Sequence, residues 1–282
     1  MNNYEKLEGM VAATFTPLDE NGDVNLSVID KYADWIASTP IKGVFVCGTT
    51  GEFSSLTIDE RKLILEKWLV SARKRFKVIA HVGSNCQRSA MELARHAAQV
   101  GADAIASIAP SFFKPGTVDE LVDFFAPICH SAAGLPFYYY NMPSITGVNL
   151  PVDKFLVEGK KKIPNLVGTK FTHNNLMEMG VCIELEQHRF EVLHGYDEIL
   201  ISGLAMGAVA GVGSTYNYIP NVYQAIFDSM KMNDLETARH NQIKSIRTVE
   251  VIIKYGGGVR GGKAIMKLIG IDCGSCRLPI KP

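Results

Sequence analysis

Residues 77–109, KVIAHVGSNCQRSAMELARHAAQVGADAIASIA, contain the pattern that decides the fold. Two apolar runs, 77–83 and 102–109, flank the segment 87–100, in which apolar residues recur at three- and four-residue spacing. The runs are typical of strands and the segment between them is typical of an amphipathic helix. Runs that are apolar almost throughout indicate strands covered on both faces, as in a parallel sheet. This stretch therefore predicts a strand, a helix and a second strand parallel to the first.

Similar apolar runs recur along most of the chain. They cover residues 9–16, 42–48, 136–141, 166–172, 190–195 and 208–215. Eight strands that alternate with helices, at intervals of roughly 25 to 30 residues, predict a (β/α)8 TIM barrel. A doubly wound open sheet is the alternative, because the number of strands alone does not establish closure. The pattern then becomes wholly helical, so we expect a barrel core over residues 1–217, with additional C-terminal helices over 218–282 in the same structural domain.

Several short motifs carry local predictions. Ser27 is expected to cap one helix, and Thr57 followed by Glu60 matches a capping box at the start of another. Residues 256–261, GGGVRG, match G-x-G-x-x-G, but they follow a helical pattern and too few residues remain for a nucleotide-binding unit. We therefore expect a helix end and a flexible connection there. Residues 273–276, CGSC, lack a second ligand pair for zinc, so a loop is expected.

Composition argues against several classes of protein, although it does not exclude local charged patches. The 282 residues are 47% hydrophobic and 21% charged, and 29 basic residues balance 29 acidic ones. No net charge draws the chain to nucleic acid or to an acidic membrane. Charged residues near the N-terminus and the lack of an apolar run of about 18 residues argue against a signal peptide or a membrane helix. Six thinly spread cysteines are expected to be reduced and mostly buried, as in a cytoplasmic protein.

Lys170 is the strongest candidate for a catalytic residue. It follows the apolar residues 166–169 inside a predicted strand, near the strand's C-terminal end, where barrel active sites form. Burial disfavours an ammonium and can lower its pKa by as much as about 3 to 5 units, which frees the amine to form a Schiff base. The alternative is a lysine that reaches water or pairs with Glu52 or Asp197. Thr172 shares its face of the strand.

Other strand ends carry polar residues that suit the same chemistry. Tyr140 could relay a proton, although aromatic packing is expected to explain most of the tyrosines in its run. Thr49 and Thr50 lie in a tight turn that offers N–H groups and hydroxyls to a carboxylate. Asp197 and Glu198 could accept hydrogen bonds from a polyol, or simply lie in the first turn of a helix.

The histidines leave a metal-dependent route open. His81, His173 and His194 lie on or near separate predicted strands and could converge on a zinc ion that assists aldol cleavage. Lys170 makes that the poorer hypothesis, since a buried amine supplies the electron sink without a metal.

These motifs together resemble one family over nearly the full chain. The quoted segments are GMVAATFTP, GTTGE, HVGS, PFYYYNMPSITGV, GTKFTHNN, GYDE and GVGSTYN, all in family order. The chain is therefore similar to the N-acetylneuraminate lyase group of the dihydrodipicolinate synthase-like class I aldolases. The resemblance implies that Lys170 forms the Schiff base and that Tyr140 relays a proton. It also implies substrate contacts, with the pyruvate carboxylate for Thr49 and Thr50, and with the sugar for Thr172, Gly195, Asp197, Glu198 and Ser214.

The resemblance also implies an activity. It predicts reversible cleavage of N-acetylneuraminate to N-acetylmannosamine and pyruvate by a homotetramer, with no metal or organic cofactor. Ile145 stands where dihydrodipicolinate synthases carry an arginine, so a second carboxylate loses its bidentate partner. Phe112 and Phe113 replace a tyrosine that in some members reaches a neighbouring subunit. The alternatives are another pyruvate-dependent aldolase, such as dihydrodipicolinate synthase or a keto-deoxy sugar acid aldolase, and a non-catalytic sugar-binding relative.

Overall fold

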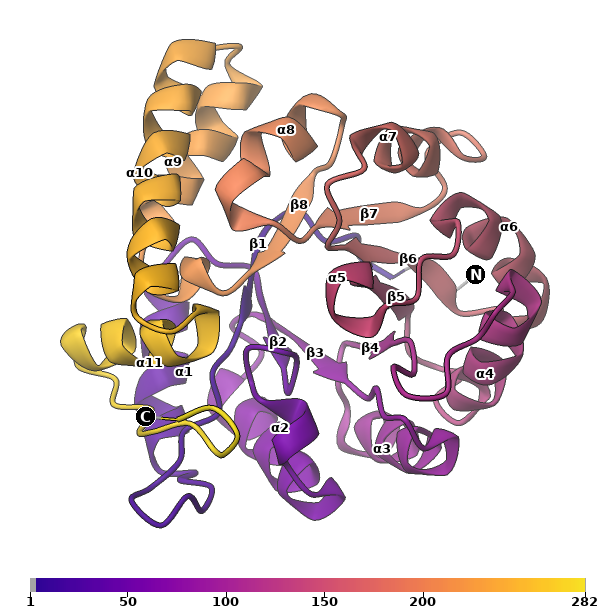
Figure 1. Cartoon of the computed structure of the whole chain (residues 1–282), viewed down its shortest axis with the longest axis horizontal. Helices are drawn as coiled ribbons and strands as arrows, with labels where there is room; N and C mark the ends of the chain where they lie inside the picture. Colours follow the sequence, from indigo (N-terminus) through magenta and orange to yellow (C-terminus); the bar gives the residue numbers. More distant parts are fainter. Residues whose placement is uncertain (1–3, 282) are drawn as a thin grey trace. The chain divides into compact units, whose positions relative to one another are not determined.

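The structure, a computed structural model, describes residues 4–281. Within that range eight strands form a closed barrel in chain order, β1 to β8, and the recorded pairings are parallel. The strands are β1 Gly9–Ala13, β2 Gly43–Val46, β3 Lys77–His81, β4 Ala104–Ile108, β5 Phe137–Asn141, β6 Leu166–Phe171, β7 Glu191–His194 and β8 Ala210–Gly213 (Figure 1). The predicted (β/α)8 barrel is confirmed, and the open doubly wound sheet is excluded.

Helices separate the strands and continue beyond the last one. They are α1 Val28–Ala37, α2 Ile58–Ala72, α3 Gln87–Val100, α4 Val118–His130, α5 Pro143–Thr146, α6 Val152–Lys162, α7 Leu176–Glu184, α8 Leu200–Ala205, α9 Pro220–Lys231, α10 Leu235–Lys254 and α11 Gly258–Leu268. Short 3-10 turns are η1 Phe53–Ser55, η2 Asp197–Ile199 and η3 Thr215–Asn217. The predicted C-terminal helices are therefore present. The assignment of residues 1–217 and 218–282 to one structural domain stays a prediction.

The described residues divide into two compact units. The first unit contains residues 4–8, 79–196 and 202–211, and the second contains 9–78, 197–201 and 212–281. The first is packed around aromatic rings: those of Tyr139 and Phe155 lie 4.6 Å apart between centroids. In the second, Tyr32 and Trp68 meet edge to face at 5.0 Å, and α9 runs beside α10 (Figure 1). Each unit therefore has a core of its own.

One of the two predicted helix caps is confirmed. The Thr57 hydroxyl accepts a hydrogen bond from the Glu60 N–H at 3.2 Å, and the Glu60 carboxylate accepts one from the Thr57 N–H at 2.8 Å. Helix α1 begins directly after Ser27, as expected, but the Ser27 hydroxyl donates to Asn25 Oδ1 at 2.6 Å and makes no cap. The prediction for Ser27 is wrong because a neighbouring amide oxygen competes for the hydroxyl.

The connection between helices in the glycine-rich run 256–261 is shorter than predicted. Helix α10 ends at Lys254 and α11 begins at Gly258, so only Tyr255, Gly256 and Gly257 link them, and the two glycines have positive φ. Gly261, in the run, and Gly262, directly after it, permit close packing: a Cβ added at Gly261 would lie 3.0 Å from Ile252, and one at Gly262 would lie 2.3 Å from the Phe15 ring. Periodicity did not reveal this, since a glycine that serves packing looks the same in sequence as one that ends a helix.

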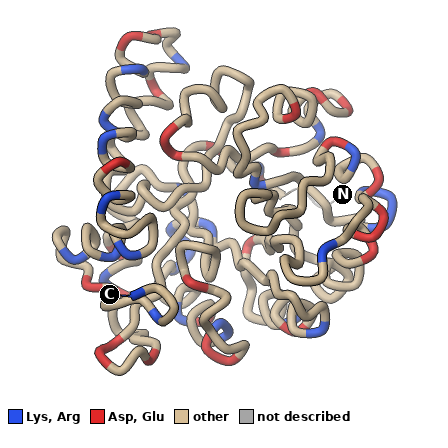
Figure 2. Tube along the Cα trace, in the orientation of Figure 1, with Lys and Arg blue, Asp and Glu red and all other residues tan. Residues whose placement is uncertain are grey.

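Charges and cysteines follow the composition. Lys and Arg are interspersed with Asp and Glu along the chain of both units (Figure 2). No helix within residues 4–281 combines the length and apolar character needed to cross a membrane. All six cysteines are free in the structure, and four of them are buried. The segment 273–276 is a loop, as predicted.

A buried carboxyl in the first unit joins the N-terminal segment to the strands. Glu191, at the start of β7, is 4% exposed. Its Oε2 accepts hydrogen bonds from the Leu7 N–H at 2.9 Å and from the Tyr138 hydroxyl at 3.0 Å. Burial raises the pKa of Glu191 from 4.5 to about 7, and the Leu7 hydrogen bond only partly opposes that shift.

The raised pKa of Glu191 predicts a pH-dependent stability. The folded state binds the proton of the Glu191 carboxyl more tightly than the unfolded state does. The stability that this proton contributes to the folded state is therefore fully present below pH 4.5 and is lost as the pH rises through about 7. The loss approaches about 3 kcal/mol in the free energy of unfolding. We expect Glu191→Gln to remove most of that loss between pH 5 and pH 8, measured by urea unfolding. Glu8→Gln, at an exposed carboxyl, is the control, and an unchanged pH profile in the Glu191 variant would contradict the assignment.

Candidate active site

The first unit brings Lys170 and Tyr140 together. These residues pair in register between the neighbouring strands β6 and β5, which places their side chains on the same face. Both are buried, at 4% and 2% exposure. Lys170 Nζ lies over the Tyr140 ring, 4.1 Å from its centroid. The predicted neighbourhood of amine and phenol is therefore present, and the amine is held against the aromatic face.

The other tyrosines of β5 have packing roles. The Tyr139 ring contacts Phe155, and burial raises its pKa to about 12. Tyr138 gives its hydroxyl to Glu191. Tyr140 differs, because its hydroxyl reaches Met142 Sδ at 3.0 Å, a weak acceptor. Of the three tyrosines of β5, only Tyr140 pairs in register with Lys170.

Thr172 and Gly195 form a second contact in the first unit. The Thr172 N–H donates to Asn141 O and the Gly195 N–H donates to Phe171 O, both at 2.9 Å, so the ladder continues past the strand ends. A Cβ added at Gly195 would lie 1.9 Å from Thr172 Oγ1. Gly195 therefore leaves the space that the Thr172 side chain fills. Thr172 Oγ1 is buried and has no hydrogen-bond partner among residues 4–281, which suits a hydroxyl that meets a ligand.

In the second unit, Thr49 and Thr50 lie in a tight turn directly after β2. Both are half-buried. The Glu52 N–H donates to Thr49 O at 3.1 Å, and the Thr16 hydroxyl donates to Gly51 O at 2.7 Å. A Cβ at Gly51 would lie 3.1 Å from a backbone carbonyl, so the turn has little room to widen. The predicted turn of small polar residues is therefore present and is held from two sides.

Asp197 is held by hydrogen bonds within the second unit. It is 5% exposed and opens η2. Its Oδ2 accepts from the Thr215 N–H at 2.9 Å and the Thr215 hydroxyl at 2.6 Å. A Cβ at Gly213 would lie 1.7 Å from Asp197 Oδ1, so the carboxylate fits only against a glycine. Glu198 and Ser214 are both half-buried. Asp197 thus has the helix-terminal position considered from the sequence, together with a fixed carboxylate.

Helix α10 supplies two residues that sequence reasoning missed. The main-chain oxygen of Asp197 accepts hydrogen bonds from Gln242 Nε2 at 3.0 Å and from Ser245 Oγ at 3.2 Å. Ser245 also bonds the Tyr223 hydroxyl at 2.7 Å. Gln242 and Ser245 are buried polar residues three positions apart on one helix, and that spacing was the available signal. The C-terminal helices therefore position the segment that carries Asp197.

The structure also places the residues of two alternative hypotheses: Glu52 as an ion-pair partner of Lys170, and three histidines as zinc ligands. Glu52 makes its ion pair with Lys263, at 2.7 Å. His81 and His194 are buried, and the His173 ring lies 6.0 Å from that of Phe171. Among residues 4–281, no three side chains of the His, Cys, Asp and Glu types are grouped as ligands for a metal ion.

Comparison with known proteins decides the family. The model of the dihydrodipicolinate synthetase family matches residues 6–282. The chain belongs to this family. Among its relatives, N-acetylneuraminate lyase of Mus musculus is 43% identical over 281 residues, which cover 98% of this chain and 88% of that one. The Gallus gallus enzyme of the same name is also 43% identical, over 99% of this chain and 92% of that one.

Solved structures agree with the family membership. N-acetylneuraminate lyase of Proteus mirabilis superposes with a TM-score of 0.96 at 37% identity, over 99% of this chain and 94% of that one. Dihydrodipicolinate synthase of Aquifex aeolicus superposes with a TM-score of 0.90 at 26% identity, over 98% and 92% of the two chains. Both branches of the family share the barrel, and this chain has the higher identity to the lyase.

Proposed function

We propose that this member of the dihydrodipicolinate synthetase family is an N-acetylneuraminate lyase, which reversibly cleaves N-acetylneuraminate to N-acetylmannosamine and pyruvate. The observation that carries the proposal is the buried Lys170 amine over the Tyr140 ring. Full-length identity of 43% to curated lyases supports the choice of substrate. This is class I aldolase chemistry, in which an amine of the chain supplies the electron sink.

The chemistry begins at Lys170 Nζ. The amine adds to the ketone of the open-chain sugar acid and, with loss of water, forms an iminium ion. The electrons of the C3–C4 bond then move into the iminium and leave an enamine, while Tyr140 relays the proton of the C4 hydroxyl to the substrate's own carboxylate as the aldehyde forms. Return of that proton to C3 of the enamine and hydrolysis of the imine release pyruvate and restore the amine.

The remaining predicted residues bind and orient the substrate in this proposal. Thr49 and Thr50 hold the carboxylate, so that the ketone carbon meets the amine in a reactive geometry. Thr172 offers its buried hydroxyl to the sugar, and Gly195 leaves space for it. The sugar contacts in the second unit are Asp197, Glu198 and Ser214.

The proposal also covers cofactors, partners and substrate preference. It uses no metal or organic cofactor and acts on small molecules, with no nucleic acid or membrane partner, as a cytoplasmic homotetramer. The side chain of Ile145, in α5, is 62% exposed and offers no charged group to a second carboxylate. Substrates with one carboxylate and a hydroxylated tail are therefore preferred over aspartate semialdehyde.

A substrate panel tests the proposal. Pyruvate release from N-acetylneuraminate is compared with release from a 2-keto-3-deoxy sugar acid and with condensation of pyruvate with aspartate semialdehyde. We expect kcat/KM for N-acetylneuraminate to exceed the others by at least about 10-fold, since unpaired polar groups penalise the wrong substrate. A chelator should leave the rate unchanged. Faster condensation with the semialdehyde, or loss of activity with chelator, would assign the chain to one of the alternatives.

A further inference from the structure

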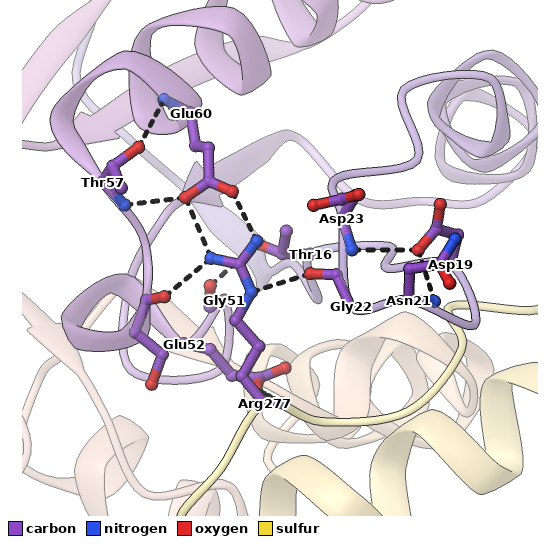
Figure 3. A network of polar contacts seen from close by, with 11 residues as sticks. Thr16, Asp19, Asn21, Gly22, Asp23, Gly51, Glu52, Thr57, Glu60 and Arg277 are labelled. Atoms are coloured by element: carbon purple, nitrogen blue, oxygen red, sulfur yellow. Dashed lines mark hydrogen bonds and ion pairs between the residues drawn. The ribbon is translucent and has the colours of Figure 1, made fainter.

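The C-terminal segment, residues 271–281, is tied to the start of the second unit through one arginine. Figure 3 shows Arg277 among the loops that follow β1 and β2. Its Nε donates to Gly22 O and its Nη1 to Ser55 O, both at 2.8 Å. The guanidinium also forms a two-point contact with the Glu60 carboxylate, at 2.9 Å through Nη1 and through Nη2 to the other oxygen. One side chain thus joins three separate segments.

Glu52 receives a second set of contacts from the C-terminal region. It is 4% exposed and has a left-handed backbone with φ of 56°. Its Oε2 accepts from the Arg277 N–H at 2.9 Å, and its Oε1 pairs with Lys263 Nζ at 2.7 Å. Lys263 also donates to Ser275 O at 2.8 Å, so it ties α11 to the C-terminal segment as well. A glutamate adopts this backbone conformation only where its surroundings hold it.

The held backbone of Glu52 is continuous with the turn of Thr49 and Thr50. The Glu52 N–H donates to Thr49 O at 3.1 Å, and the next N–H, of Phe53, donates to Gly48 O at 3.3 Å. A change in the Glu52 backbone must therefore move the turn. The Glu60 carboxylate that Arg277 grips also accepts from the Thr57 N–H, which ties the chain after the turn to the start of α2.

We propose that Arg277 and Lys263 are positioning residues for the Thr49–Thr50 turn. Residues 271–281 act as a C-terminal strap, which keeps the N–H groups and hydroxyls of that turn aligned for the substrate carboxylate. The inference rests on the proposed function. Neither side chain needs to touch the substrate. Lys263 acts through its ion pair with Glu52. The Arg277 side chain acts through Glu60 and Ser55, and so holds in place the main-chain N–H of Arg277 that Glu52 accepts. Loss of alignment weakens carboxylate binding first, since the reacting amine belongs to β6 and not to the turn.

The test measures pyruvate binding apart from turnover. Arg277→Ala is compared with the parent by the pyruvate concentration that gives half-maximal borohydride trapping at Lys170, and by kcat and KM for N-acetylneuraminate. We expect the pyruvate concentration for half-maximal trapping and the KM for N-acetylneuraminate each to rise by about 10- to 100-fold. A displacement of about 1 Å in the groups that position a substrate has an effect of this size. Trapping at saturating pyruvate should reach the parent level, and kcat should change far less. A role confined to stability would lower the unfolding midpoint and leave these constants unchanged.

Two further variants make the result specific. Arg277→Lys keeps the charge opposite Glu60 but not the planar fork, so we expect partial rescue, with half-saturation raised by about 3-fold or more. Arg247→Ala is the matched control, because this arginine lies on α10 and pairs with Glu250 at an exposed site. It should behave as the parent does.

The outcomes separate the strap from the proposed function. Parent-like half-saturation in folded Arg277→Ala, or a fall in kcat with half-saturation unchanged, would overturn the role of the strap alone. If the alanine variant fails to fold, parent-like half-saturation in Arg277→Lys overturns it equally. Absence of trapping in the parent itself would overturn the proposed function, and the strap with it.

Discussion

Replacing Lys170 with alanine is expected to abolish cleavage, with a loss of at least about 10⁴-fold in kcat, a scale typical of removing a catalytic nucleophile. The reason is specific to the amine. Without Nζ no imine forms, and no other group named in the site offers an electron sink for the C3–C4 bond. The residues proposed to bind the substrate carboxylate, Thr49 and Thr50, are unchanged in this variant, so substrate binding should fall much less than turnover.

Covalent trapping provides the measurement for Lys170. Pyruvate with borohydride should add one reduced adduct to the parent, located at Lys170 by peptide mass, and none to the alanine variant. Lys170→Arg provides a long basic side chain that cannot form the imine, so it should be as inactive as alanine. Lys161→Ala, on an exposed face of α6, is the control and should retain both label and activity. An adduct that persists in Lys170→Ala would refute the assignment.

The part of this site that could be predicted from sequence is the part governed by local rules. Lys170 and Tyr140 meet because they lie on adjacent strands and because side chains alternate between the faces of a strand. The capping box of Thr57 and Glu60 was likewise readable, since its two hydrogen bonds join residues three apart.

The contacts that escaped prediction depend on tertiary packing. Arg277 reaches Glu60 across 217 residues of sequence, and no periodicity encodes which loop a C-terminal arginine meets. The contact of Gln242 was unpredictable for the same reason: a buried amide in a helix must have a hydrogen-bond partner, but the sequence does not show which residue that partner is. The error at Ser27 has a local cause: its hydroxyl bonds Asn25 Oδ1, and its backbone, with φ of −66° and ψ of −27°, lacks the extended conformation typical of a capping residue.

Asp197 carries the second large effect, because sugar binding and imine formation should respond differently to its loss. We expect Asp197→Ala to lower kcat/KM for N-acetylneuraminate by about 100-fold or more, as when charged hydrogen bonds to a substrate are lost. Pyruvate trapping at Lys170 should stay within about threefold of the parent, because pyruvate has no polyol tail for the carboxylate to hold.

The geometry around Asp197 supplies the control that this prediction needs. Its carboxylate accepts two hydrogen bonds from Thr215, so alanine also leaves a buried N–H without its acceptor and costs about 1 to 3 kcal/mol in the free energy of unfolding. Thr215→Val removes the hydroxyl while keeping that N–H and the carboxylate. It should therefore lower kcat/KM far less than Asp197→Ala, and leave trapping unchanged. Equal losses of cleavage and trapping in Asp197→Ala would instead mean that the carboxylate serves only to hold η2 against η3.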